Sequence, residues 1–143
     1  MKKGSTIIES IISMSIVLIA LNISVQIFLI SSKSILVRKS REKANRISYA
    51  IENEIKYNVS FENIERTFIN GNLSLKYKEN ILDTLLTTPV LLLERGNEII
   101  IEEKVNNSIE DDYKITTFKI TINDSDGGKL NEREFIKSYW MEV

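Results

Sequence analysis

Glu9 is the side chain with the clearest chemical potential in this sequence, because it stands at the start of an apolar run that continues to about Ile30. A charged side chain at the centre of a lone helix in lipid costs roughly 2.5–3.5 kcal/mol on insertion scales. The cost is smaller near the end of such a helix, but it does not vanish. We therefore expect Glu9 to have a cationic partner. Two cations, Lys2 and Lys3, precede it in the sequence.

A glycine separates these lysines from the apolar run: Gly4 follows them, and Glu9 stands four residues beyond Ser5. With Thr6, this arrangement resembles the class III signal of type IV prepilins and pseudopilins, in which a short basic leader ends in glycine. The resemblance implies that a prepilin peptidase cleaves between Gly4 and Ser5, that Ser5 is then N-methylated, and that Glu9 is the assembly glutamate. Ser5 departs from the family pattern, since the first residue after cleavage is most often phenylalanine.

The resemblance also implies a function, which is that of a structural subunit rather than an enzyme. The chain would be a minor pilin or pseudopilin of a type IV pilus, a competence filament or a type II secretion-like filament. Its partners would be the prepilin peptidase, other pilin or pseudopilin subunits, the pilus assembly machinery and the membrane. It would first cross the cytoplasmic membrane once, with its C-terminal domain outside, and then join a pilus or pseudopilus at the cell surface. The sequence does not separate these filaments from one another.

An alternative from another class is a single-pass membrane-anchored binding protein with a small extracytoplasmic β domain. It explains an apolar span and a sheet equally well. It does not explain why Gly4, Thr6 and Glu9 occur together.

Composition excludes several kinds of site. The 143 residues include no histidine and no cysteine, so no Ser-His-Asp or Cys-His nucleophile and no zinc site of the usual kind can form. With 19 basic and 20 acidic residues, the chain has no excess charge that would attract nucleic acid. We expect no catalytic residues and no cofactor.

One acidic turn invites a calcium assignment, with Asp124 and Asp126 as weak candidate ligands. The EF-hand loop requires a glycine at its sixth position and a glutamate at its twelfth. Lys129 and Phe135 stand at those positions. The template fails, and we predict a glycine-assisted turn with no metal.

The apolar segment from Ser10 to Ile30 is 21 residues long, close to the ~20 needed to cross a bilayer as a helix. Asn22 and Gln26, one helical turn apart, are candidates for hydrogen bonds to neighbouring helices. Six basic residues follow the segment: Lys33, Arg38, Lys39, Arg41, Lys43 and Arg46. The positive-inside rule alone would therefore place the C-terminal region in the cytoplasm. The processing motif requires the opposite orientation, and we adopt it.

Beyond the span, the sequence predicts that the same helix continues. Neither proline nor glycine occurs between Ser5 and Val59, and Ala44, Ile47, Ile51 and Ile55 form one apolar stripe. We divide the chain into a leader (1–4), a transmembrane and assembly helix (5–32), its amphipathic continuation (33–59) and a globular β-sheet domain (60–143).

The globular part reads as an antiparallel sheet. After an Asn70-Gly71 turn, Leu73, Leu75 and Tyr77 alternate as in a short strand, and 78–86 could form a short helix. The predicted main strands are 90–93 and 99–101, joined by an Arg95-Gly96-Asn97 turn, then 113–122 and 132–141. In the third, Thr116, Phe118, Ile120 and Ile122 should face the helix. The last should carry Phe135, Tyr139 and Trp140. The predicted fold class is α+β, with a long N-terminal helix packed on a small pilin-like sheet.

Overall fold

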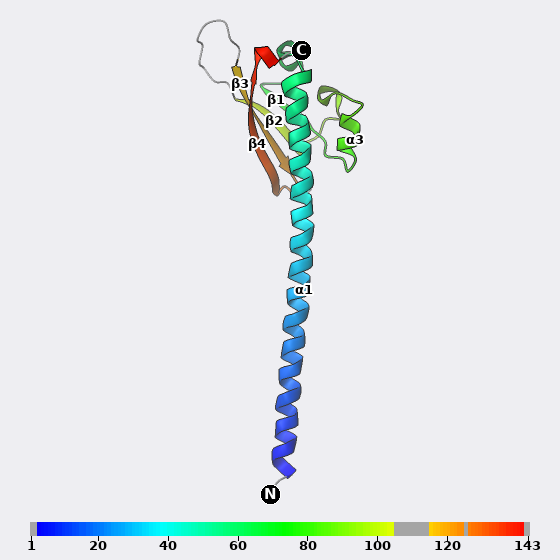
Figure 1. The fold of residues 1–143 in the computed structure, drawn as a ribbon, viewed down its shortest axis with the longest axis vertical. Helices are drawn as coiled ribbons and strands as arrows, with labels where there is room; N and C mark the ends of the chain where they lie inside the picture. Colours follow the sequence, from blue (N-terminus) through cyan, green and yellow to red (C-terminus); the bar gives the residue numbers. More distant parts are fainter. Residues whose placement is uncertain (1–2, 105–114, 125, 142–143) are drawn as a thin grey trace. The chain divides into compact units, whose positions relative to one another are not determined.

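The structure, a computed structural model, describes residues 3–104, 115–124 and 126–141. Figure 1 shows its elements in chain order, with one long helix and one antiparallel sheet. They are α1 (Lys3–Asn53), the π-helical turn η1 (Glu54–Asn58), α2 (Phe61–Thr67), β1 (Asn72–Leu75), α3 (Ile81–Leu85), the 3-10 turn η2 (Val90–Leu92), β2 (Ile99–Lys104), β3 (Ile115–Asn123), β4 (Lys129–Ser138) and the 3-10 turn η3 (Tyr139–Met141). The predicted α+β class is confirmed.

The chain divides into two compact units, residues 1–39 and 40–143. The first unit is wholly helical in its described part. It belongs to α1, which is long and apolar enough to cross a membrane. Helical structure continues to Asn58, as the absence of proline and glycine predicts, although its last turn is π rather than α.

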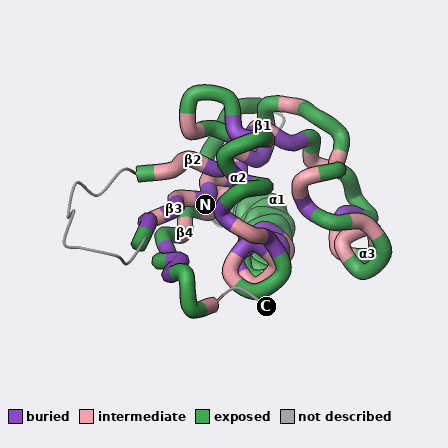
Figure 2. Tube along the Cα trace, turned by 90° about the horizontal axis from the view of Figure 1, so that it is seen from above, coloured by how far each residue is buried: buried purple, intermediate pink, exposed green. Residues whose placement is uncertain are grey.

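In the second unit, the C-terminal part of α1 presents the predicted apolar stripe to the core. Ala44, Ile47, Ile51 and Ile55 are all fully buried. The helix ends where Val59 takes an extended conformation, and Ser60 then caps α2 by accepting a hydrogen bond from the Asn63 amide at 3.3 Å. Buried residues, purple in Figure 2, gather between the helix and the strands beside it.

The four strands lie in the order β1-β2-β3-β4, and each pairs with the next in antiparallel fashion. In β3, Thr116, Phe118, Ile120 and Ile122 are buried, so the predicted inward face is confirmed. Phe118 lies at the centre of this face. Its ring stacks on that of Phe135 of β4, with 5.5 Å between the ring centroids, and makes a T-shaped contact with Phe68, with 6.0 Å between the centroids.

Two local predictions hold in the middle of the chain. Asn70 and Gly71 form a tight turn with φ of 54° and 75° before β1. The short helix expected over 78–86 is present as α3. Tyr77, which was expected to belong to the same strand as Leu75, lies just beyond the end of β1.

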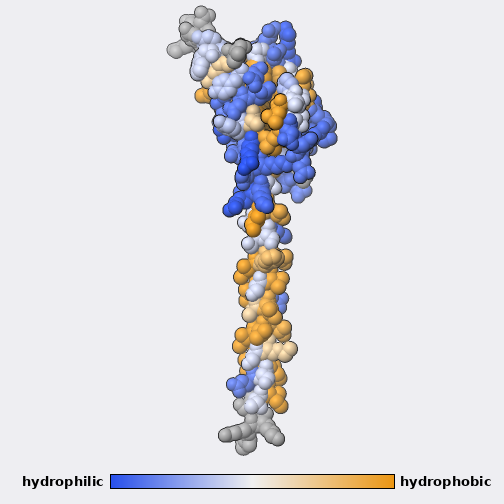
Figure 3. Space-filling model, turned by 45° about the vertical axis from the view of Figure 1, so that its right-hand side comes forward, coloured by the Kyte–Doolittle hydropathy of each residue, from blue (hydrophilic) through white to orange (hydrophobic). Residues whose placement is uncertain are grey.

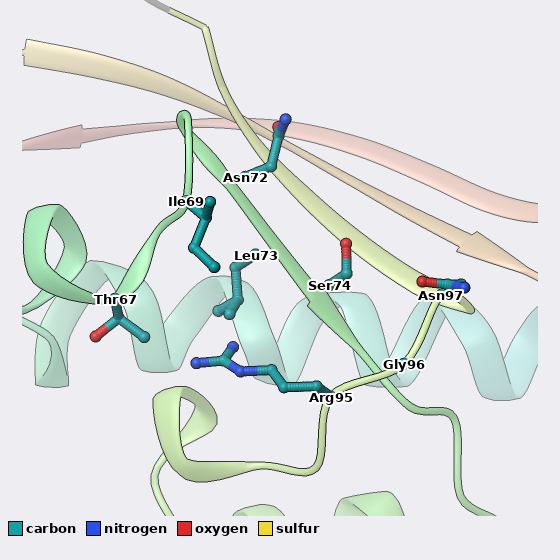
Figure 4. Close-up of a pocket in the computed structure, with 8 residues that line it drawn as sticks. All are labelled: Thr67, Ile69, Asn72, Leu73, Ser74, Arg95, Gly96 and Asn97. Atoms are coloured by element: carbon teal, nitrogen blue, oxygen red, sulfur yellow. The ribbon is translucent and has the colours of Figure 1, made fainter.

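The prediction that 90–93 is a strand is wrong. Val90–Leu92 form the 3-10 turn η2 after Pro89, and β1 takes the place beside β2, with Leu73 opposite Ile101. Arg95-Gly96-Asn97 is therefore not a hairpin between two main strands. Figure 4 shows this segment running beside β1. There the Lys76 amide donates to the Glu94 carbonyl at 2.9 Å, and the Gly96 amide donates to the Ser74 carbonyl at 3.4 Å. The segment 94–97 therefore protects the outer edge of the sheet. The apolar run 90–93 was misassigned because four apolar residues suit a strand and a buried turn equally well.

The last strand also differs from its predicted bounds. β4 begins at Lys129 rather than Glu132 and ends at Ser138, so Tyr139 and Trp140 lie exposed in η3 instead of in the sheet. Phe135 is buried as expected. Of the predicted strand 113–122, residues 113 and 114 lie outside the described part of the chain, and β3 extends one residue further to Asn123.

Candidate functional site

Glu9 lies on α1 in the first unit, where its side chain is exposed. It is the only charged residue between Thr6 and Ser32. Within the part of the chain that the structure describes, no side chain pairs with its carboxylate. The backbone of Lys3, Gly4 and Ser5 forms the first turn of α1, and Lys2 lies outside the described residues. The partner expected for Glu9 is therefore not supplied by the described side chains of its own chain.

Large apolar side chains near Glu9 on α1 are uncovered. Ile7, Ile8, Ile11 and Ile12 are each more than half exposed, and Phe28 and Ile30 near the other end of the segment are 70% and 68% exposed. Figure 3 shows apolar side chains (orange) along much of the visible face of the helix, interrupted by paler, more polar residues. Such a surface requires lipid or other helices around it.

The serines of this segment satisfy their own hydroxyl groups, as is common in membrane helices. Each donates to the carbonyl oxygen four residues earlier, at 2.8–2.9 Å: Ser10 to Thr6, Ser13 to Glu9, Ser15 to Ile11, Ser24 to Ala20 and Ser32 to Phe28. They therefore add little polarity to the surface. They also keep the side chains small, so that another helix can approach closely.

Asn22 behaves similarly, since its amide donates to the Leu18 carbonyl at 3.1 Å. Gln26 makes no hydrogen bond with the described residues. The prediction that these two side chains bond to neighbouring helices remains a prediction, and Gln26 is the better placed of the two.

Between residues 6 and 26, the small and uncharged polar residues of α1 fall on two opposite faces. One face carries small residues that interrupt the apolar surface, and we call it the small-residue line. At 3.6 residues per turn, it covers an arc of about 80° around the helix axis. It consists of Thr6, Ser10, Ser13, Ala20 and Ser24, with Val17 between them. The opposite face, about 180° away, carries larger polar side chains within an arc of about 40°, and we call it the polar line. It consists of Ser15, Asn22 and Gln26. Both lines could have been recognised in the sequence, because their successive polar or small residues are three, four or seven positions apart.

A second group of polar side chains fixes β4 against the helix in the second unit. We call it the polar seam; it joins Ser48, Glu52 and Lys56 on the helix to Asn131, Arg133 and Lys137 on β4. The Asn131 amide donates to the Ser48 hydroxyl at 2.8 Å. The Arg133 guanidinium donates to the Glu52 carboxylate, which also accepts from the Lys56 ammonium at 2.6 Å. The sequence predicted only the apolar stripe of this helix, and the structure adds that Ser48 and Glu52 are covered by β4.

The environment of Glu52 changes its pKa in two opposing ways. Burial raises the pKa of the carboxyl, but the hydrogen bonds and positive charges of Lys56 and Arg133 together lower it below its ordinary value. Glu52 therefore serves as an anion that joins the helix to β4.

The remaining candidates are an acidic turn and a pocket. Asp124 and Asp126 are exposed on the turn between β3 and β4, where the Gly127 amide donates to the Asp124 carbonyl at 2.9 Å. The described residues bring no group of three acidic side chains together. A pocket of about 490 Å³ beside β1, shown in Figure 4, has Thr67, Ile69 and Arg95 in its wall. The Arg95 guanidinium there donates to the Leu91 carbonyl at 3.4 Å, and the pocket lining includes no acid or base able to act on a ligand.

No family model, curated protein or solved structure matches this chain. Its function must be argued from its own residues.

Proposed function

We propose that this chain is a filament subunit of the type IV pilin class, and more narrowly a minor pilin or pseudopilin. The observation that carries the proposal is Glu9. It is an exposed carboxylate without a partner among the described residues, on an apolar helix long enough to cross a membrane. Its position four residues beyond Ser5 matches the processing signal given above.

In this mechanism the prepilin peptidase cuts after Gly4 and creates a positively charged amine on Ser5. The amine of one subunit then pairs with Glu9 of its neighbour. Each charge alone would lose hydration in a low-dielectric surrounding, and the pairing offsets that loss. The pair therefore sets the axial position of one helix against the next.

The two lines on α1 support this proposal. A helix inside a fibre is surrounded by other helices, and small side chains on one face allow their backbones to approach. The polar line on the opposite face offers Gln26 to a second neighbouring helix. The side-chain amide of Gln26 has no hydrogen bond within the described part of its own chain. A lone lipid anchor has no use for two such faces.

A membrane-anchored binding protein is the second candidate. The observation in its favour is that the serines and Asn22 already bond within their own helix, so a single span is stable without neighbours. This candidate leaves Glu9 unexplained.

The test is processing. The full chain is co-expressed with a prepilin peptidase, and its N-terminal sequence and intact mass are measured. We expect a chain that begins at Ser5 and carries the mass of one added methyl group. A Gly4→Val variant, which alters only the residue before the scissile bond, should keep Met1 or Lys2 at its terminus. If the unaltered chain also keeps its leader beside a peptidase that cleaves a known prepilin, the anchored binding protein is the better description.

A further inference from the structure

The helix carries a band of cations just beyond its apolar run. Lys33, Arg38 and Lys39 are exposed in the first unit. Within the described residues none of them forms an ion pair or a hydrogen bond through its side chain. By contrast, Arg46 further along α1 is bonded to Glu42 at 2.8 Å. We call Lys33, Arg38 and Lys39 the basic collar.

The collar surrounds the helix. At 3.6 residues per turn, its three side chains lie about 140°, 100° and 120° from one another around the axis. A helix that lies on a flat anionic surface concentrates its cations on one side. Cations on every side are useful to a helix that emerges through such a surface, because each of them then faces it.

Apolar residues are interleaved with the collar. Ile35, Leu36 and Val37 lie between Lys33 and Arg38 and are 50%, 65% and 48% exposed. The axial rise from Lys33 to Lys39 is about 9 Å, and a headgroup layer is roughly 5–8 Å thick on each side of the bilayer. Lysine and arginine stems bury along apolar surface while their charges reach polar groups. A mixture of exposed aliphatic and cationic side chains at this depth fits the boundary between acyl chains and headgroups.

We propose that the basic collar binds anionic phospholipid headgroups at the membrane surface from which the globular domain extends. The ligand is the phosphate of lipids with a net negative charge, such as phosphatidylglycerol, and the membrane holds the subunit through this contact in addition to its apolar span. This contact also explains why more cations follow the apolar span than precede it, because those that follow it would bind lipid at the surface where the domain emerges. The proposal requires only that α1 spans the membrane, and it does not depend on processing or polymerisation.

The test measures which lipids contact the helix. The full chain is reconstituted into phosphatidylcholine vesicles that contain a trace of spin-labelled phosphatidylglycerol or spin-labelled phosphatidylcholine. The motionally restricted fraction of each label gives their relative association with the protein. We expect a preference for phosphatidylglycerol of about fivefold, since a basic residue near an anionic surface contributes about 1 kcal/mol. The preference should fall towards one in high salt.

Two triple variants identify the cations responsible. K33Q/R38Q/K39Q should remove most of the preference, and glutamine has a similar helix propensity, so carbonate extraction should still find the variant in the membrane. R66Q/K78Q/R95Q removes the same charge from exposed positions of the second unit and should keep the preference. An equal association of both lipids with the unaltered chain would overturn the proposal, as would an undiminished preference in the collar variant or a lost preference in the control.

One further outcome would give the collar a different ligand. If the unaltered chain shows no lipid preference, while the collar variant reduces chemical cross-linking between copies, the cations bind acidic side chains of a second copy. That result would overturn the lipid proposal. It would leave the processing test unaffected, because cleavage is measured at the opposite end of the apolar run.

Discussion

The Lys137 ammonium donates a hydrogen bond to the Lys56 carbonyl oxygen at 2.9 Å and so joins the end of β4 to the last turn of the long helix. Lys137 is fully buried, and its ammonium also lies 5.1 Å from the centre of the Phe61 ring. The carbonyl groups of a final helical turn have no partner within the helix, and a cation there also interacts favourably with the helix dipole. This one side chain therefore supplies a hydrogen bond to a carbonyl at the end of the helix and holds β4 against that end.

Replacing Lys137 should reveal this dual role. Lys137→Met keeps an unbranched chain against Phe61 but leaves the Lys56 carbonyl without this donor, so we expect a loss of about 1–3 kcal/mol in the free energy of unfolding. Lys137→Ala also removes the packed stem and should cost more. The measurement is urea unfolding of the full chain in detergent micelles, followed by the fluorescence of Trp140, which is the second residue after the end of β4. Equal stability of Lys137→Met and the unaltered chain would mean that the bond contributes nothing.

Glu52 should make the stability of the second unit depend on pH. Its pKa is lower in the folded chain than the ordinary value of 4.5, because the bonds from Lys56 and Arg133 outweigh the effect of burial. A carboxyl with a lowered pKa contributes stability above its unfolded pKa, and this contribution is lost as the pH falls through the folded value. We expect Glu52→Gln to cost about 1–3 kcal/mol at pH 7 and progressively less below about pH 4.5.

A second carboxylate provides the control for this experiment. Glu132 on the outer face of the sheet pairs with Lys119 at 3.1 Å and also with Lys129, and its side chain is one-third exposed. The pKa of Glu132 is also lowered by these two lysines, but solvent screens such pairs. Glu132→Gln should therefore change stability much less than Glu52→Gln at pH 7. Equal effects of both variants would show that the seam is no more than another surface ion pair.

Gly96 should tolerate no side chain, because the segment beside β1 approaches the strand closely. A Cβ atom there would lie 2.6 Å from the Lys76 Cα atom, so backbone would have to move. We expect Gly96→Ala to cost about 1–3 kcal/mol, as overpacking commonly does. Gly128→Ala is the matched control, since a Cβ atom at that position meets nothing within 4 Å. The same urea unfolding measures both, and similar losses would mean that the close approach at Gly96 relaxes without cost.

The sequence predicted the helix and the inward face of β3 because periodicity alone determines them. Four residues of one stripe are buried from Ala44 to Ile55, and alternation places Phe118 and Ile120 on one face. The segment 90–93 was misjudged because four apolar residues suit either a strand or a turn packed on the core. The strand beside β2 is β1, in which Leu73 lies opposite Ile101. A local sequence pattern does not show which of two distant segments will pair with a given strand.

The functional residues also include some that the sequence predicts and some that it does not. Glu9 was recognisable from the sequence because a lone carboxylate in an apolar run is unusual. The polar seam was not, because its bonds between the helix and β4 join residues about eighty positions apart, such as Ser48 and Asn131. The amphipathic pattern distinguishes the core side of the helix from the rest, but it does not tell which polar side chains a strand will cover.

The small-residue line should be a contact surface between helices. Ser24→Leu fills that line, whereas Val25→Leu enlarges a side chain between the two lines and is the matched control. Because the chain has no cysteine, a single Ser13→Cys substitution provides an unambiguous cross-link between copies. We expect Ser24→Leu to reduce the yield of disulfide-linked dimers in membranes and Val25→Leu to leave it unchanged. Equal yields from the two variants would assign the contact to another face.

Glu9 should be required for assembly but not for cleavage. Glu9→Ala keeps Gly4 and Ser5, so the peptidase should process it normally, while the amine of the neighbouring subunit loses its partner. We expect the yield of sheared filaments to fall by about tenfold or more, which corresponds to at least about 1.4 kcal/mol per contact. Glu9→Gln keeps the shape and a hydrogen-bond acceptor but no charge, so an intermediate yield would measure the electrostatic part of the pairing. Normal filaments from Glu9→Ala would show that the pairing is not needed. Accumulation of uncleaved Glu9→Ala would instead place Glu9 in recognition by the peptidase, and the pairing would have no support.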